Sequence, residues 1–264
     1  AIVATYISDY IFPSIIRGAE KYLSENGYQV SLFSTDNNHL NEKKILEKII
    51  TQDFAGIIFE PTKSAIANPN INYYLNIESK GIPYIMIHAY YEELEPWSIT
   101  VDDEKGGYLQ AEHLIKLGHR NIAGFFKTDD LQGKRRMKGY IKAHRANNVP
   151  INPNHLITYS SVNKEKKPAI ELKQLLQSID PPSAIVCYND ELAVLLLEVL
   201  QKEKLRVPED ISIVGFDDAH FSRASRLTTI KHPQSEMGKE AAKMILQLVE
   251  NRYKSSDEKG IESI

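Results

Sequence analysis

The sequence has very little cysteine. Cys187 is the one cysteine among 264 residues, so no disulfide can form within the chain. This usage fits a reducing compartment, and we expect a cytoplasmic protein. The apolar neighbours of Cys187 favour an inert packed thiol over a nucleophile.

Long apolar runs are also lacking. No stretch approaches the ~20 residues that a membrane-spanning helix needs, and no secretory signal opens the chain. We therefore expect no membrane partner. The chain begins abruptly at Ala1, inside a predicted strand, so we expect the sequence to be a fragment of a longer protein.

Excess positive charge is absent, because 32 Lys and Arg residues face 35 Asp and Glu residues, for a net charge of −3. Domains that hold nucleic acid by themselves usually carry a basic face. No helix-turn-helix, zinc finger or basic zipper pattern occurs. This segment is therefore not expected to bind DNA on its own.

Catalytic and metal-binding motifs are missing as well. The patterns HExxH, CxxC, GxSxG, GxxxxGK and GxGxxG do not occur. Three adjacent aspartate pairs, at 102–103, 129–130 and 217–218, place carboxylates on neighbouring residues, whose side chains point apart on a strand. We predict no catalytic residue, no cofactor and no metal site.

The most informative stretch that is present covers residues 183–218. A short apolar run at 183–187 is typical of a parallel strand buried on both faces, and a helix with an apolar stripe follows. A second strand at 211–214 completes a βαβ unit. Asn189 and Asp217 then lie at the carboxyl ends of strands, where open parallel sheets bind ligands.

The same alternation of strands and helices runs through the whole chain. It predicts an α/β protein with two doubly wound parallel-sheet subdomains, strands crossing between them and a ligand cleft. The N-terminal subdomain is expected at 1–99 plus 233–252, the C-terminal subdomain at 100–232, and a polar tail at 253–264. Strands at 97–101 and 227–231 are the expected crossings, and a helix at 235–249 is expected to return to the first subdomain.

Several motifs together resemble the effector-binding core of the LacI/GalR-type transcriptional repressors. They are CYNDELA and VPEDISIVGFDD within 183–218, VDD followed by GG at 101–107, LIKLGHRNIA at 114–123 and LTTIKHP at 227–233. The resemblance implies the periplasmic-binding-protein type I fold, a homodimer, and a DNA-binding domain upstream of this segment. It covers residues 2–249.

A finer resemblance is to the arabinose-responsive repressors of Gram-positive bacteria. It rests on TYISDYIFPSIIRG at 5–18, EPTKSA at 60–65 and FKTDDLQGKRRMKGY at 126–140. It implies a sugar effector, with L-arabinose the best candidate, and operator DNA contacted by a winged-helix headpiece outside this sequence. Binding of the sugar is then expected to release the operator.

Three residues match ligand positions of the family. Arg136 matches its sugar-binding arginine, whose planar fork bridges two hydroxyls better than lysine does, and Asn189 and Asp217 match two further ligands. Sugar sites combine such groups with aromatic faces. The alternatives are a surface arginine, a helix cap at Asn189 and a turn aspartate at Asp217.

Six further candidates are supported by the finer resemblance or by their place at a predicted strand. They are Tyr10, Phe12, Glu60, His88, Lys127 and His232. Ordinary packing is the alternative for Tyr10 and Phe12, whereas a carboxylate that ends an apolar strand, as Glu60 does, needs a partner or water.

The sequence thus predicts a sugar-binding and dimerisation domain of a bacterial repressor. A periplasmic sugar-binding protein of a transporter shares the fold, and the residues before Ala1 would distinguish the two by a DNA-binding domain or a signal peptide. A sugar-processing enzyme on a doubly wound fold is the second alternative, and turnover of bound sugar would reveal it.

Overall fold

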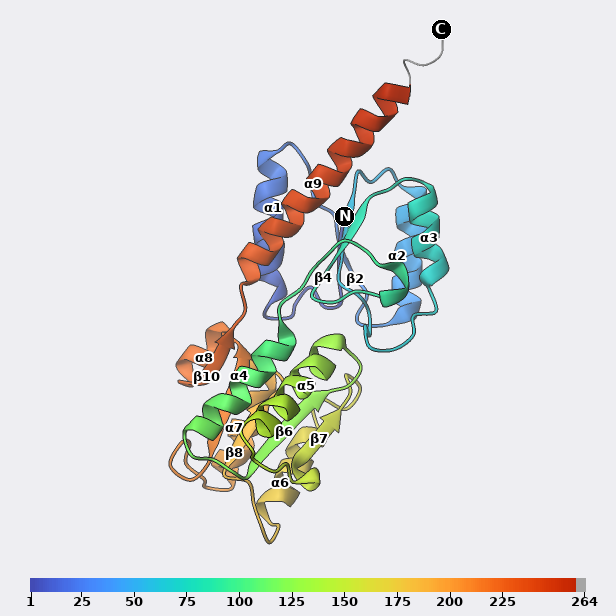
Figure 1. Ribbon diagram of the computed structural model, residues 1–264. Coiled ribbons are helices and arrows are strands. Elements are labelled where there is room, and N and C mark those ends of the chain that lie inside the picture. The colour runs from blue at the N-terminus through green and yellow to red at the C-terminus, as the bar shows by residue number, and fades with distance from the viewer. Residues whose placement is uncertain (260–264) are drawn as a thin grey trace. The chain divides into compact units, whose positions relative to one another are not determined.

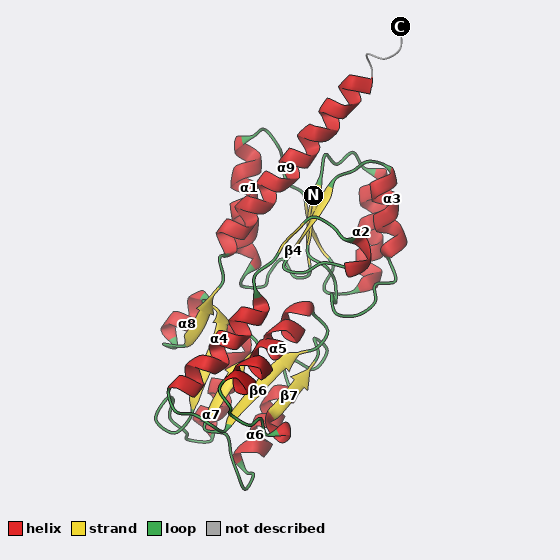
Figure 2. Cartoon of the chain, in the orientation of Figure 1, coloured by secondary structure: helices red, strands yellow, loops and turns green. Residues whose placement is uncertain are grey.

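The computed structural model describes residues 1–259, which form two compact units (Figures 1 and 2). The first unit contains Ala1–Val101 together with the chain from Pro233 onward, and the second contains Asp102–His232. The chain therefore passes between units after Val101 and again after His232.

A five-stranded parallel sheet forms the centre of the first unit, in the order β2-β1-β3-β4-β5. Its strands are β1 (Ile2–Ala4), β2 (Leu32–Ser34), β3 (Ile57–Phe59), β4 (Tyr84–Ile87) and β5 (Ser98–Ile99). One face packs against α1 (Phe12–Glu25) and α9 (Gln234–Lys259). The other packs against α2 (His39–Thr51) and α3 (Ile71–Ser79), and the short η1 (Glu92–Leu94) precedes β5.

The second unit repeats this plan with the order β10-β9-β8-β6-β7. Its strands, all parallel, are β6 (Ile122–Lys127), β7 (Leu156–Tyr159), β8 (Ala184–Cys187), β9 (Ser212–Asp217) and β10 (Thr228–Lys231). Helices α4 (Asp103–Lys116) and α5 (Leu131–Ala146) cover one face, and α6 (Lys167–Leu176) and α7 (Asp190–Lys202) cover the other. The short η2 (Pro153–His155) and α8 (His220–Ala224) complete the unit.

Counted along the chain, each unit has the strand order 2-1-3-4-5, so the second unit repeats the fold of the first. The central strands are apolar on both faces because helices cover both. All four residues of β8 are buried, and so are all four of β4. The two-domain α/β class predicted from the strand–helix alternation is confirmed.

Several element bounds differ from the predictions. The strands expected to cross between the units, β5 and β10, are edge strands of their own sheets, and the chain changes unit after each of them. The strand β7 and the helix α8 were not predicted. Helix α6 begins at Lys167, because Pro168 suits the first turn of a helix.

Helix α9 continues to Lys259 although the apolar pattern predicted an end at 249. Residues 250–259 contain neither glycine nor proline, and the first glycine follows at 260, so nothing in the sequence stops the helix earlier. The predicted polar tail at 253–264 is thus helical as far as Lys259, and its last five residues lie outside the described part. Across residues 1–259, no helix is both long and apolar enough to cross a bilayer.

Candidate functional site

The strand order creates one topological switch point in each sheet, between β1 and β3 in the first unit and between β6 and β8 in the second. Ligands of open parallel sheets bind outside the carboxyl ends of the strands at such points. Five of the predicted residues follow or end these strands and their neighbours. Glu60 follows β3, His88 follows β4, Lys127 ends β6, Asn189 follows β8 and Asp217 ends β9.

Arg136 is the centre of the polar group in the second unit, which we call the arginine cluster (Asp103, Arg136, Tyr188, Phe216 and Asp217). Its Nε donates to Oδ1 of Asp103 at 2.8 Å, and its Nη1 donates to the carbonyl oxygen of Tyr188 at 2.7 Å. The guanidinium carbon lies 3.5 Å from the ring centroid of Phe216 and 4.9 Å from that of Tyr188. Arg136 is therefore buried against two aromatic rings rather than exposed in a basic run.

Burial alone would lower the pKa of Arg136, which is 4% exposed. The negative charges of Asp103 and Asp217 outweigh this effect and raise the pKa above its usual value. The side chain is thus a fixed cation, and Asp103 is its ion-pair partner. Asp217 lies 3.9 Å from Nη2, which is too far for a hydrogen bond.

The arginine keeps donors available for a ligand. Its two hydrogen bonds use two of five guanidinium N–H groups, and within residues 1–259 the other three have no hydrogen-bond acceptor. The Asn189 oxygen caps α7 by accepting from the amide of Leu192 at 2.9 Å, as the sequence allowed. The side-chain NH₂ of Asn189 makes no hydrogen bond within the described part of the chain.

Lys127 is connected to the ring of Tyr188 through Asp130. Its Nζ lies 3.0 Å from Oδ2 of Asp130, and that oxygen accepts from the hydroxyl of Tyr188 at 2.8 Å. Burial raises the pKa of Asp130, but the charge of Lys127 and the hydrogen bonds outweigh burial and lower it. The ionised Asp130 also caps α5 through the amide of Gly133. Lys127 therefore helps to hold the ring on which Arg136 stacks.

Glu60 is the centre of the polar group in the first unit, the glutamate cluster (Thr5, Phe12, Glu60 and His88). Glu60 Oε2 accepts from the amide of Thr5 at 2.6 Å and from its hydroxyl, which bridges the ends of β1 and β3. Its other oxygen lies 3.3 Å from Nδ1 of His88, and Phe12 packs edge-on against the His88 ring at 5.5 Å. Phe12 is 1% exposed and so supports His88.

Two of the predicted residues have an unusual backbone. His88 has φ of 66° and Asp217 has φ of 111°, both in the region that favours glycine. Such conformations cost free energy and gather at functional sites, where the surrounding structure enforces them. They lie at the carboxyl ends of β4 and β9, the edge at which ligands are expected.

The remaining two predicted residues lie at the same edges. His232 follows β10, is 6% exposed, and its backbone amide donates to the carbonyl oxygen of Asp217 at 3.4 Å. Tyr10 is half-buried in the turn before α1.

The sequence did not identify four residues that build the clusters, Thr5, Asp103, Tyr188 and Phe216. A signal existed for two of them, because Tyr188 and Phe216 immediately precede Asn189 and Asp217. Asp103 belongs to the VDD motif, but nothing in that motif indicated an arginine partner.

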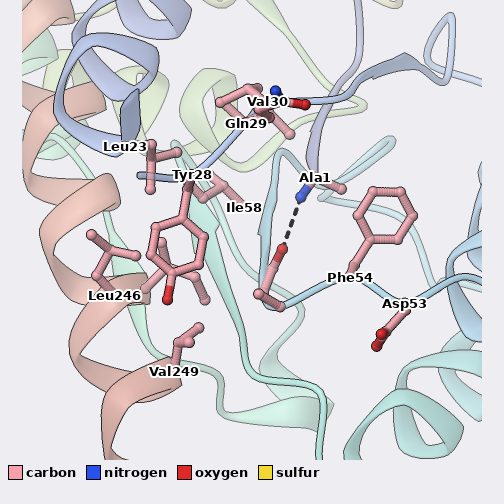
Figure 3. A pocket seen from close by; sticks show the side chains of 14 residues that line it. Ala1, Leu23, Tyr28, Gln29, Val30, Asp53, Phe54, Ile58, Leu246 and Val249 are labelled. Atoms are coloured by element: carbon pink, nitrogen blue, oxygen red, sulfur yellow. Dashed lines mark hydrogen bonds between the residues drawn. The ribbon is translucent and has the colours of Figure 1, made fainter. Parts of the chain in front are cut away.

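A cavity of about 290 Å³ lies at the opposite, amino-terminal edge of the first sheet (Figure 3). Apolar side chains form most of its wall, including Leu23, Ile58 and Val249. The carbonyl oxygen of Gly56 already accepts a hydrogen bond from the nitrogen of Ala1 at 2.8 Å. This cavity contains none of the predicted residues and offers few groups for a sugar. Among the side chains that the structure describes, no three His, Cys, Asp or Glu residues are grouped to hold a metal ion.

Comparison with known proteins identifies the family. Residues 111–262 match the periplasmic binding protein-like domain. The chain is 56% identical over its full length to the arabinose metabolism transcriptional repressor of Halalkalibacterium halodurans, covering 71% of that protein. It is 52% identical to the repressor of the same name from Geobacillus stearothermophilus, with 95% of this chain and 70% of the relative covered.

The fold agrees with this match. The transcription regulator CcpA of Lactococcus lactis superposes with a TM-score of 0.82 at 22% identity, over 95% of this chain and 92% of that one. Because the relatives are repressors, the domain is part of a regulator, and the alternatives of a transporter-associated binding protein and of an enzyme fall away. The chain belongs to the family of the arabinose metabolism transcriptional repressors and contains their periplasmic binding protein-like domain.

Proposed function

We propose that this domain binds a sugar effector, with L-arabinose as the preferred ligand, and that the bound sugar releases the repressor from operator DNA. The names of the two relatives support both the sugar and the repressor activity. The DNA-binding headpiece is expected outside this sequence, and the working form is expected to be a cytoplasmic homodimer.

The observation that carries this proposal is the state of Arg136. A buried guanidinium is already neutralised by Asp103 and fixed by stacking, yet three of its N–H groups are left for a ligand. Two hydroxyls on adjacent carbons of a sugar match such a fork. The face of Tyr188 suits the C–H side of a sugar ring.

The two clusters offer complementary chemistry. Arg136 and Asn189 present donors, and Glu60 presents a carboxylate that can only accept. Sugar hydroxyls both donate and accept, so they can pair with either kind of group. We therefore propose Arg136, Asn189 and Asp217 as the main ligands of the sugar. Tyr10, Phe12, Glu60, His88, Lys127 and His232 would contact or support the sugar.

Release of DNA then follows from linkage. If the sugar binds one conformation of the repressor better than another, it shifts the population toward that conformation. The factor by which sugar weakens DNA binding must equal the factor by which DNA weakens sugar binding.

Calorimetric titration tests the proposal. The domain is titrated with L-arabinose, D-xylose, D-ribose and D-galactose under identical conditions. Saturable heat is expected with L-arabinose at the lowest concentration. No heat from any of the four would refute a sugar sensor of this class, and tighter binding of another sugar would replace L-arabinose as the effector.

A further inference from the structure

One face of helix α4 contacts the arginine cluster at several points. Asp103, Gly106, Gly107 and Gln110 lie at positions i, i+3, i+4 and i+7, which is one side of a helix. All four are buried. Asp103 supplies the carboxylate that pairs with Arg136, and the other three residues act on the surroundings of that arginine.

The two glycines permit contacts that no other residue would allow. A Cβ atom on Gly107 would overlap the carbonyl oxygen of Arg136, so α4 and α5 touch there through their backbones. A Cβ on Gly106 would overlap the ring of Phe216, on which Arg136 stacks. Helix α4 thus sets both the backbone position of the arginine and its aromatic platform.

Gln110 extends this control to the ends of two strands. Its side-chain NH₂ donates to the carbonyl oxygens of Cys187 at 2.9 Å and of Gly215 at 2.7 Å. The register between β8 and β9 runs to the pair Val186 and Val214, and Gln110 bonds the next residue of each strand. The amide therefore bridges the two strands where their own pairing stops, and both of its N–H groups are used.

The position of this bridge connects it to the ligand residues. Cys187 lies two residues before Asn189, and Gly215 lies two residues before Asp217. Gln110 is fully buried behind these strand ends, so it acts through the residues it holds. If the bridge were lost, the ends of β8 and β9 could separate and displace both side chains.

We propose that Gln110 is a positioning residue for sugar binding, and that the α4 face of Asp103, Gly106, Gly107 and Gln110 holds the ligand side chains of the second unit in place. This inference rests on the proposed sugar-binding function. It assigns an effect on affinity to a buried glutamine that acts only through the residues it holds.

The test compares Gln110→Met with a control that acts on the same two strands. Methionine keeps the length of the side chain but removes both donors. The control is His119→Phe, because His119 bridges Ser183 and Ser212 at the amino-terminal ends of β8 and β9, with distances of 2.9 and 3.0 Å. Each variant removes a side chain that bridges β8 and β9 through two hydrogen bonds. Only Gln110 makes its bridge at the carboxyl ends of the strands, where the ligand is expected.

Melting temperature without sugar and Kd for L-arabinose are measured for each protein at one temperature well below melting. We expect both variants to melt at a lower temperature than the unaltered domain. The Kd should rise about tenfold or more for Gln110→Met and stay unchanged for His119→Phe. A purely structural glutamine would change the melting temperature alone, because Kd reports on folded molecules. Unchanged Kd in Gln110→Met would overturn the inference.

Gly106→Ala provides a second measurement if Gln110→Met fails to fold. Alanine favours a helix over glycine, and the group it meets is the end of the Phe216 side chain, which can shift. This variant should fold and bind L-arabinose more weakly, and an unchanged Kd would again refute the inference. Absence of binding by the unaltered domain is a different result, because it refutes the proposed function itself.

Discussion

Replacing Arg136 by lysine separates charge from geometry in the proposed site. Lysine keeps the positive charge next to Asp103, so the buried carboxylate is not left without a partner. Alanine is the poorer choice, because removing one partner of a buried ion pair typically costs about 3–5 kcal/mol of folding free energy. A loss of binding in Arg136→Ala would then be confused with a loss of fold.

The expected size of the effect follows from the contacts. Arg136 holds Asp103 and the carbonyl of Tyr188 with two N–H groups and has three left. A lysine that satisfies those two acceptors has one N–H left, so at least one charge-assisted hydrogen bond to the sugar is lost. Such a bond contributes about 1.5–3 kcal/mol, which corresponds to roughly 10- to 150-fold in Kd.

Calorimetric titration with L-arabinose measures this change, and thermal melts without sugar report the stability. Arg145→Lys is the matched control, because Arg145 is an exposed arginine in the last turn of the same helix. The control should bind as the unaltered domain does. Equal affinity in Arg136→Lys, Arg145→Lys and the unaltered domain would show that Arg136 is a structural residue and not a ligand.

Two further predictions concern the other charged groups. Glu60→Gln should raise the Kd for L-arabinose about tenfold, because a neutral amide is a weaker acceptor for the sugar than a carboxylate; an unchanged Kd would show that Glu60 is not a ligand. Lys127→Met removes the main charge that keeps the pKa of Asp130 low, so burial should then raise that pKa. A carboxyl group whose pKa is lowered by folding stabilises the folded state at any pH above its pKa in the unfolded chain. This contribution is lost as the pH falls through its pKa in the folded protein. The variant should therefore melt at a lower temperature than the unaltered domain at pH 7. This difference should shrink as the pH falls from the raised Asp130 pKa of the variant to the lowered pKa of the unaltered domain, and a pH-independent difference would contradict the role of this pair.

Most of the fold could be predicted from the sequence, because its strands and helices produce local patterns of apolar and polar residues. Short apolar runs followed by amphipathic helices identify parallel strands and their coverings, and polar residues mark the strand ends. The positions of Asn189 and Asp217 at strand ends could be predicted in this way, because each follows or ends an apolar run. The same logic failed for β7, where the residues alternate between buried and half-buried and leave no continuous apolar run.

The partner of Arg136 could not be predicted from such patterns. Asp103 lies 33 residues away on another helix, and the two meet because α4 and α5 approach through glycines. A Cβ on Gly139 would overlap the carbonyl oxygen of Glu104, just as one on Gly107 would overlap that of Arg136. Glycine in a helix reads as a weak helix former in the sequence. Its use for close packing appears only when both helices are placed.

The two carboxylates near Arg136 have different roles, which follow from their distances to the guanidinium. Asp103 forms the hydrogen-bonded ion pair and so makes burial of the charge tolerable. Asp217 lies 3.9 Å from Nη2, close enough to stabilise the cation but without using one of its N–H groups. A sugar hydroxyl near both groups can accept from Arg136 and donate to Asp217. If Asp217 were the hydrogen-bonded partner instead, the sugar would have to break the bond between Arg136 and Asp217 before it could bind. Part of the binding energy that the guanidinium supplies would then be lost.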